Sequence, residues 1–531
     1  MNAEDRETVV DSARYLRAVR PVDPAELAGY VDAHPAVVRR VLRERATDLD
    51  LVERTDGAFV PVDDSPAPDE VGRVRRLPVR YDRRLADVLA ETHGPEWATG
   101  ESGDGLRERV RRLKSDYYND RDVTYDRTTA LGYAVYHLPD FYAAVQYALD
   151  PVAEAGLLPR HLRVLDVGAG VGGPALGLHD YLFGPPGAEA DDDGRPPPTD
   201  RAPDETAALV DYHAVEPSAA ADVLVSLLEE TGRNFHATVH RDTAEAFDPG
   251  VPVSGNTATT RDDADGDARH GGYDLVLFAN VLNELTAPVA TLRRYLARLA
   301  PDGTLLALSP ADRATSVGLR RVERAVVDGP GADVPDGRGD GTGPEELPPA
   351  AVTAFAPAVR LWPDYRPTDE GWSFDERPAL EPTATQRRLD RPAGSEGEFR
   401  KTAVRFSYSA LRRDGRERVR FVPDEDRLAP MARAEEYVTD RVDLAGVKLS
   451  RSLSEDAGRD ENPVYRVGDG SQEVAHFAVL TRETTLNRVL SRAGYGDPLL
   501  FENVLALYND DEEDYNLVVD DETVVDRIPV G

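Results

Sequence analysis

The sequence contains no cysteine, which excludes disulfide bridges, Cys-ligated zinc or iron–sulfur centres and a Cys nucleophile. It also has no uninterrupted apolar run long enough to cross a bilayer. The first ten residues, MNAEDRETVV, are charged and lack the apolar core of a signal peptide. We therefore expect a cytoplasmic protein with no membrane partner, no metal and no iron–sulfur cluster.

Lysine is nearly absent as well. Only Lys114, Lys401 and Lys448 occur, and arginine supplies the other basic side chains of the chain. Acidic residues are in excess, and the formal net charge is −35 at pH 7. Because Val, Leu and Ala remain abundant, this composition is not that of a disordered chain. It is typical of a halophile, so we interpret the acidity as a solvation trait of a salty cytoplasm rather than a clue to a partner.

The N-terminal region, residues 1–63, predicts three short helices followed by a hairpin around Asp56-Gly57. This order resembles a winged helix-turn-helix, an α+β domain. A small docking domain with a solvated arginine face is an equal alternative. Residues 64–157 form a basic segment that predicts helices leading into the next domain.

Alternating strand and helix patterns over residues 158–327 predict an α/β, Rossmann-like domain with a parallel sheet. The expected strands are RVLDVGAG, DYHAVEPS, FHATVH, YDLVLFANVL and TLLALSP. Pro-, Gly- and Asp-rich stretches near 184–205 and 248–272 predict disordered insertions, and 328–350 a disordered linker.

The C-terminal region, residues 351–531, predicts many short strands and hence a β-rich, OB-like barrel or a sandwich. Within it, VRFSYSALRRDGRERVRFV predicts a hairpin around Asp414-Gly415.

A glycine-rich loop follows the first strand of the α/β region, in LDVGAGVGGPA. Its spacing satisfies the dinucleotide fingerprint, and so many glycines indicate a close approach to the backbone. However, Asp166 just ahead of the loop would repel a pyrophosphate, whereas S-adenosylmethionine (SAM) has no phosphate and offers a cationic amino group. The sequence therefore favours SAM over a dinucleotide.

Two acidic residues later in the chain lie where SAM binding would require them. Glu216 ends the second strand and is placed to accept hydrogen bonds from the ribose hydroxyls, and Asp242 follows the third strand near the expected adenine. Each has the alternative of a solvated loop acid. The expected cofactor residues are Asp166, Gly168, Ala169, Gly170, Gly172, Glu216, Asp242 and Asn280.

The motif FANVLNEL ends the fourth strand, at the sheet edge where open α/β folds bind ligands. It supplies the candidate catalytic residues Asn280, Asn283 and Glu284. The alternative is that these side chains only open the next helix and satisfy local backbone. This domain has no Cys nucleophile, no Pro-Pro-aromatic turn and no lysine, which excludes the methyl-transfer mechanisms that depend on them. Two possibilities are left: direct methyl transfer to an acceptor that the site only positions, or no methyl transfer at all.

Arginine clusters oppose the acidic bias of the chain, which favours an RNA-binding role over a merely solvated face. The candidate phosphate-binding residues are Arg73, Arg75, Arg76, Arg83, Arg84, Arg412 and Arg413.

Four motifs in order, VLDVGAGVGGP, VEPS, FANVLNEL and RFSYSALRRDG, resemble the methyltransferase-like family of mitochondrial small-ribosomal-subunit assembly factors and its microbial relatives. The resemblance covers roughly residues 120–420. It implies a class I SAM-dependent methyltransferase fold that contacts small-subunit ribosomal RNA and serves translation. The chain departs from that family in lacking its cysteine cluster for an iron–sulfur centre.

Three functions follow as hypotheses. The first is a SAM-dependent methyltransferase acting on RNA, with ribosomal RNA the first choice. The second is a non-catalytic SAM-binding assembly factor or winged-helix regulator. The third is a methyltransferase for a small molecule or a protein.

Overall fold

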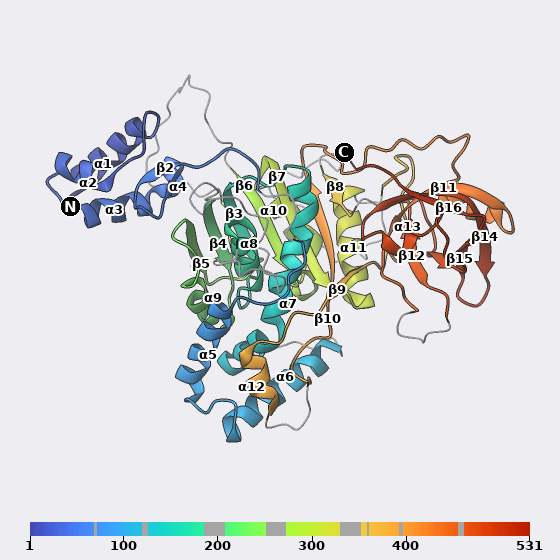
Figure 1. Cartoon of the computed structure of the whole chain (residues 1–531), viewed down its shortest axis with the longest axis horizontal. Helices are drawn as coiled ribbons and strands as arrows, with labels where there is room; N and C mark the ends of the chain where they lie inside the picture. Colours follow the sequence, from blue (N-terminus) through green and yellow to red (C-terminus); the bar gives the residue numbers. More distant parts are fainter. Residues whose placement is uncertain are drawn as a thin grey trace. The chain divides into compact units, whose positions relative to one another are not determined.

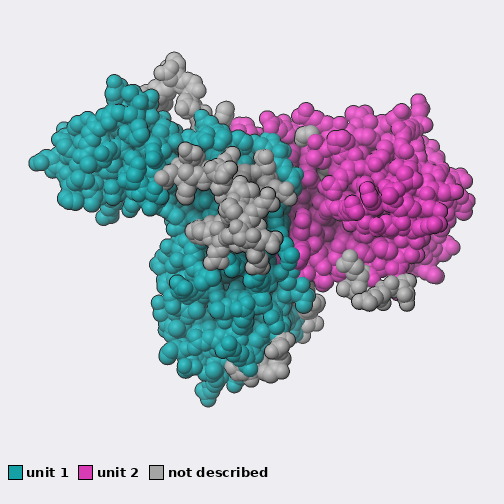
Figure 2. All heavy atoms as spheres, viewed as in Figure 1, with its two compact units in different colours: residues 1–277, 379–402 teal, residues 278–378, 403–531 magenta. Residues whose placement is uncertain are grey.

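The computed structural model (Figure 1) describes residues 1–67, 72–118, 126–184, 208–250, 272–329, 352–357, 360–391, 397–454 and 461–530. The chain divides into two compact units (Figure 2). Unit 1 comprises residues 1–277 and 379–402, and unit 2 residues 278–378 and 403–531. The insertions and linker expected at 184–205, 248–272 and 328–350 lie, apart from their ends, outside the described residues.

Unit 1 begins with a small helical region that ends in a two-stranded antiparallel hairpin. Asp23 Oδ1 accepts a hydrogen bond from Ala25 N at 2.8 Å and starts the second helix. Gly57, at φ +87°, makes the turn of the hairpin. The three predicted helices and the hairpin are therefore present, and the winged-helix assignment stays a prediction. The elements are α1 (Ala3–Leu16), α2 (Pro24–Tyr30), α3 (Pro35–Glu44), α4 (Ala46–Leu49), β1 (Leu51–Glu53) and β2 (Phe59–Pro61).

Three longer helices follow, as predicted for the basic segment: α5 (Val79–His93), α6 (Gly100–Tyr118) and α7 (Arg127–Glu154). The last is mostly buried, although it carries Pro139 and Pro151 within its length. A short helix, α12 (Ala384–Asp390), returns to unit 1 from far along the sequence. Within the described residues, no helix is long and apolar enough to span a membrane.

The α/β sheet of unit 1 has the strand order β5-β4-β3-β6. Strands β3, β4 and β5 pair in parallel, with Asp166 beside Ala214. Their near-continuous apolar burial is what a sheet covered on both faces requires. The elements are β3 (His161–Val167), α8 (Gly173–Phe183), β4 (Leu209–Val215), α9 (Ala220–Leu228), β5 (Phe235–His240) and β6 (Tyr273–Ala279), whose last two residues belong to unit 2.

In unit 2, strand β10 lies between β7 and β8 and also pairs with β9. All three pairings are antiparallel. The hairpin predicted around Asp414-Gly415 is therefore wrong: among the described residues no strand occurs between 412 and 441, and both edges of β10 already have partners. The elements are η1 (Leu282–Glu284), α10 (Pro288–Leu296), β7 (Leu299–Pro310), α11 (Arg313–Val327), β8 (Thr353–Ala356), β9 (Asp375–Pro378) and β10 (Ala403–Arg412).

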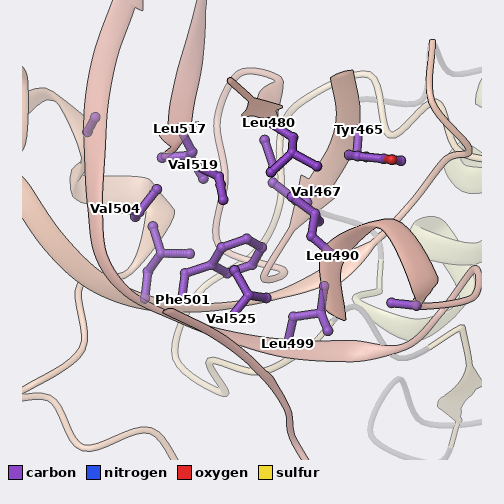
Figure 3. Close-up of a cluster of buried hydrophobic side chains, with 14 of the residues drawn as sticks. Tyr465, Val467, Leu480, Leu490, Leu499, Phe501, Val504, Leu517, Val519 and Val525 are labelled. Carbon is purple, nitrogen blue, oxygen red and sulfur yellow. The ribbon is translucent and has the colours of Figure 1, made fainter. Parts of the chain in front are cut away.

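The C-terminal part of unit 2 is a barrel, in agreement with the β-rich prediction. Strands β11, β12, β13, β15 and β14 pair in that order, and β14 returns to β11, so the ring closes, while β16 pairs with β14 outside it. Phe501, Leu517 and Val519 lie in its apolar core (Figure 3). The elements are η4 (Met431–Tyr437), β11 (Arg441–Lys448), β12 (Val464–Gly468), β13 (His476–Leu480), α13 (Val489–Arg492), β14 (Pro498–Asn509), β15 (Asp514–Val519) and β16 (Val524–Arg527).

Candidate cofactor site at the glycine loop

The glycines after β3 serve two different purposes. Gly168, Gly170 and Gly172 all have positive φ, at 72°, 54° and 95°. A Cβ on Gly172 would lie 2.7 Å from Leu224 Cδ1, and one on Gly173 would lie 2.7 Å from Phe141 Cβ. These two positions are glycine because α9 and α7 approach them. A Cβ on Gly170 would meet nothing closer than 4.0 Å, so only the first part of the loop borders open space.

Four backbone N–H groups of this loop already have acceptors. Gly168 N and Ala169 N donate to Val215 O at 2.9 and 3.2 Å, and Gly172 N donates to Ala169 O at 3.0 Å. Gly170 N donates to Glu216 Oε2 at 2.9 Å. A dinucleotide loop needs such groups for its pyrophosphate. Their engagement therefore favours a ligand without phosphate.

Asp166 is completely buried at the end of β3. Its Oδ2 accepts a hydrogen bond from the Tyr212 hydroxyl, and its Oδ1 is buried with no hydrogen-bond partner among the described residues. Burial raises the pKa of Asp166 to about 7; Glu216 adds to the rise, and the Tyr212 hydrogen bond opposes it. A buried carboxylate with one oxygen unpaired fits a cationic amino group of a ligand.

Glu216 lies at the end of β4, with an exposed fraction of 7%. Besides Gly170, it binds Ser218, whose N–H donates to Oε1 at 2.9 Å. The residue thus joins the glycine loop to the loop after β4. A carboxylate oxygen accepts more than one hydrogen bond, so this arrangement leaves room for the predicted contact with ribose hydroxyls.

Asp242 has a more local environment. Its Oδ1 accepts a hydrogen bond from Thr243 N at 2.9 Å, and the side chain is partly exposed after β5. Its contact with an adenine amino group stays a prediction.

The predicted catalytic residues belong to unit 2 and follow β6 directly. Asn280 has φ +61°, a conformation that Asn tolerates better than most residues, and its N–H donates to Leu308 O at 2.9 Å. Asn283 and Glu284 are exposed in the short helix η1. Their catalytic role stays a prediction.

The arginines proposed to bind RNA have different environments. Arg73, Arg75, Arg76 and Arg83 are exposed. Arg84 is half-buried, and it donates to Glu229 at 2.7 Å and to Ser226 O at 3.1 Å.

The assignment of Arg412 to RNA binding is wrong. Its side chain is fully buried and hydrogen bonds to Asp414, to Thr304 Oγ1 at 2.7 Å and to Asp302 O at 2.8 Å. Arg413 is partly buried and donates to Leu296 O at 3.3 Å. The arginines at this turn therefore stabilise the end of β10, because a buried guanidinium requires such partners.

The sequence identifies the class of one domain. Residues 140–328 match the family model described as a methyltransferase domain. The chain accordingly carries a SAM-dependent methyltransferase domain, with SAM as the cofactor of that domain. Residues 6–55 and 432–528 match the N-terminal and C-terminal domain models of a domain of unknown function, DUF8157. A comparison with curated proteins found no match. The family model stops at the level of methyltransferases, so the link to ribosome assembly stays a proposal.

Solved structures with some similarity include several described as methyltransferases and one described as a [4+2]-cyclase, SpnF. The mitomycin 7-O-methyltransferase MmcR shares 15% identity, with 58% of this chain and 77% of that chain covered and a TM-score of 0.19. The CurJ carbon methyltransferase shares 17% identity, with 59% of this chain and 73% of that chain covered and a TM-score of 0.24. NcsB1 is an O-methyltransferase from neocarzinostatin biosynthesis that was solved with SAM and 2-hydroxy-5-methyl naphthoic acid. It shares 16% identity, with 58% of this chain and 80% of that chain covered and a TM-score of 0.21. These low scores support no statement about the acceptor of this chain.

The sequence analysis missed Tyr212, the partner of Asp166. The register of β3 and β4, which only the structure provides, explains the contact. With Asp166 opposite Ala214, a residue two positions earlier on β4 lies on the same face of the sheet. It also did not single out His137 and Asp140, which lie in the helical segment predicted over residues 64–157.

Proposed function

We propose that this chain transfers the methyl group of SAM directly to an acceptor and that Asp166 anchors the amino group of SAM. The supporting observation is the buried Asp166 Oδ1, which has no hydrogen-bond partner in the described part of the chain. A buried polar atom without a partner is costly, and a cationic donor removes that cost.

The chain's residues bind and orient, and SAM supplies an activated methyl group. Glu216 holds the glycine loop through Gly170 N and shapes the ribose side of the site. Direct displacement needs alignment of the acceptor with the methyl group rather than a covalent intermediate on the protein. This requirement suits a site with no cysteine.

The test is calorimetry of SAM binding at pH 8 with Asp166→Asn and the control Tyr212→Phe. We expect Asn to lose most of the affinity, because the amide carries no charge for the ammonium group. Tyr212→Phe keeps the carboxylate and should bind SAM at pH 8 but lose affinity sooner as the pH falls. Equal binding by Asp166→Asn and wild type would reject the anchor.

RNA is a second proposal for the acceptor, and ribosomal RNA its first candidate. It is favoured by one observation, the exposure of Arg73, Arg75, Arg76 and Arg83 in an otherwise acidic chain. Arginine binds phosphate in bidentate fashion and stacks on bases, and these contacts survive high salt better than the point charge of lysine.

The experiment replaces these four arginines with lysine and, separately, with glutamine, and measures RNA binding in molar salt. We expect the lysine variant to bind more weakly and the glutamine variant to lose nearly all binding. If both bind like wild type, the RNA proposal loses its support.

A further inference from the structure

The N-terminal half of α7 extends past the start of α8, on the side where the glycine loop lies. The first residue of α8, Gly173, contacts Phe141, and Gly177, one turn later, contacts Val145. The residue numbers in contact increase together along both helices, so α7 and α8 run in the same direction. Residues of α7 before Phe141 therefore continue past the start of α8, at about 1.5 Å per residue. His137 lies roughly one turn, and Tyr133 roughly two turns, before Phe141, and hence past the first residue of α8 on the side of the glycine loop.

This part of α7 carries two polar atoms without partners. Asp140 has an exposed fraction of 9%, and its Oδ2 is buried without a hydrogen-bond partner in the described ranges. The same holds for His137 Nδ1, whose ring stacks on Phe141 with centroids 5.1 Å apart. Buried polar atoms normally have partners. Two such atoms one turn apart, near the proposed SAM loop, leave hydrogen-bonding capacity that a ligand can use.

Two of the three lysines of the chain lie at the same place. Lys114 Nζ, from α6, is 4.2 Å from the ring centroid of Tyr136, and Lys401 Nζ is 5.1 Å from the same centroid. Arginine is the usual basic residue elsewhere in this chain, so two lysines beside one tyrosine ring distinguish this place from the rest of the chain. The two ammonium groups give the cluster positive charge next to aromatic rings.

The charges around Asp140 suit proton transfer near neutral pH. Burial raises the pKa of Asp140 to about 7, while Lys401 lowers it. Burial, together with Lys401 and Lys114, holds the pKa of His137 well below its usual range, so this imidazole is neutral. Burial also lowers the pKa of Lys114. A base whose pKa lies near the working pH is the most efficient proton acceptor.

We propose that the cluster of Tyr136, His137, Asp140, Lys114 and Lys401, here called the α7 cluster, is the acceptor site of this methyltransferase. Its substrate is a small aromatic acid that carries a free hydroxyl. The rings of α7 contact the aromatic plane, the lysines bind the carboxylate, and Asp140 faces the hydroxyl. This inference rests on the proposed function, because it requires SAM at the neighbouring loop.

The reaction balances within these groups. The acceptor oxygen forms a bond to the methyl carbon, and the bond from that carbon to sulfur breaks with its electron pair on sulfur. The acceptor proton passes to the Asp140 carboxylate and from there to water. The products are a methyl ether and neutral S-adenosylhomocysteine, and no oxidant or metal is required.

The experiment uses the full chain with S-adenosylhomocysteine and measures binding of 2-hydroxybenzoate, 4-hydroxybenzoate and 3,4-dihydroxybenzoate by calorimetry and ligand-observed NMR. We expect at least one to bind, about tenfold more weakly to Lys401→Gln than to wild type, and nearly unchanged to Lys401→Arg. Phenol lacks the carboxylate, so its affinity should be the same for wild type and both Lys401 variants.

Methyl transfer from labelled SAM to the bound hydroxybenzoate tests Asp140. We expect Asp140→Asn to lower turnover about 100-fold while hydroxybenzoate and SAM affinities stay within threefold of wild type. Asp87→Asn, at an exposed position of α5, is the matched control and should change neither. Retained SAM affinity and an unchanged thermal transition show that each variant is folded.

Each contrary result has one meaning. If the wild type binds SAM but none of the three hydroxybenzoates, or binds them equally well with Lys401→Gln, the inference is overturned. Methylation of a single-stranded RNA oligonucleotide in place of a hydroxybenzoate overturns it in favour of RNA. Failure of the wild type to bind SAM at all instead rejects the proposed function.

Discussion

The substitution Asp166→Asn should make the ligand-free protein more stable while it removes SAM binding. Asp166 is fully buried, and burial raises its pKa from 3.8 to about 7. The folded protein therefore holds this proton more tightly than the unfolded chain does. Asparagine resembles the protonated carboxyl, since its oxygen accepts from Tyr212 and its amino group occupies the place of Oδ1.

The sign and size follow from this pKa. The stability that Asp166 contributes is fully present below the unfolded pKa of about 4 and is lost as the pH rises towards 7. At roughly 1.4 kcal/mol per unit, a shift of about three units corresponds to about 4 kcal/mol. Asparagine does not titrate. The free energy of unfolding of the Asp166→Asn variant should therefore exceed that of wild type by nearly zero at pH 4 and by about 4 kcal/mol at pH 7, and the difference should then stay constant.

The assay is scanning calorimetry from pH 4 to 8 without ligand, following the transition that SAM shifts in the wild type. That choice isolates the domain with the glycine loop in a chain of several domains. With saturating SAM the order should reverse, because ligand binding stabilises only the wild type. A variant less stable than wild type at pH 8, or a difference that does not grow with pH, would refute the reasoning.

Three further outcomes are expected. The SAM affinity of wild type should fall about tenfold per pH unit below pH 7, because Asp166 must lose its proton to bind an ammonium group; titration calorimetry checks this. Gly172→Ala should destabilise the fold by roughly 2 kcal/mol, since its Cβ would clash and its φ is +95°, whereas Gly170→Ala should cost about 1 kcal/mol; thermal unfolding compares them. Arg412→Gln should cost roughly 3 kcal/mol of stability and leave RNA binding unchanged, as measured by unfolding and RNA titration; reduced RNA binding with unchanged stability would contradict the burial.

The elements of the α/β domain were predictable because their signals are local. Apolar runs of strand length gave the five strands, and Asp166 ahead of the glycines gave a ligand without phosphate. The purpose of single glycines was not predictable. Gly172 and Gly173 are explained by Leu224 and Phe141, residues far away in sequence, whose approach depends on the packing of whole helices.

The errors have the same origin. The alternation around Asp414-Gly415 is compatible with a hairpin, but the edges of β10 are filled by β7, β8 and β9, which the local pattern cannot reveal. Arg412 was predicted to be exposed because charged residues usually are, yet its hydrogen-bond partner Thr304 is 108 residues away. His137 and Asp140 were overlooked because a polar residue in an aromatic helix signals a site only once its missing partners are known.

The contact between α7 and α8 has a mechanical consequence. Glycine at 173 and 177 lets α8 pack directly against Phe141, Tyr142 and Val145 of α7, at distances that leave no room for a Cβ, so a displacement of α7 at this contact has little free space to absorb it. If the α7 cluster binds the acceptor as proposed, any effect of the acceptor on SAM affinity must be matched by an equal effect of SAM on acceptor affinity. The two glycines, four residues apart, thus join the helix of the proposed acceptor site to the helix that follows the SAM loop.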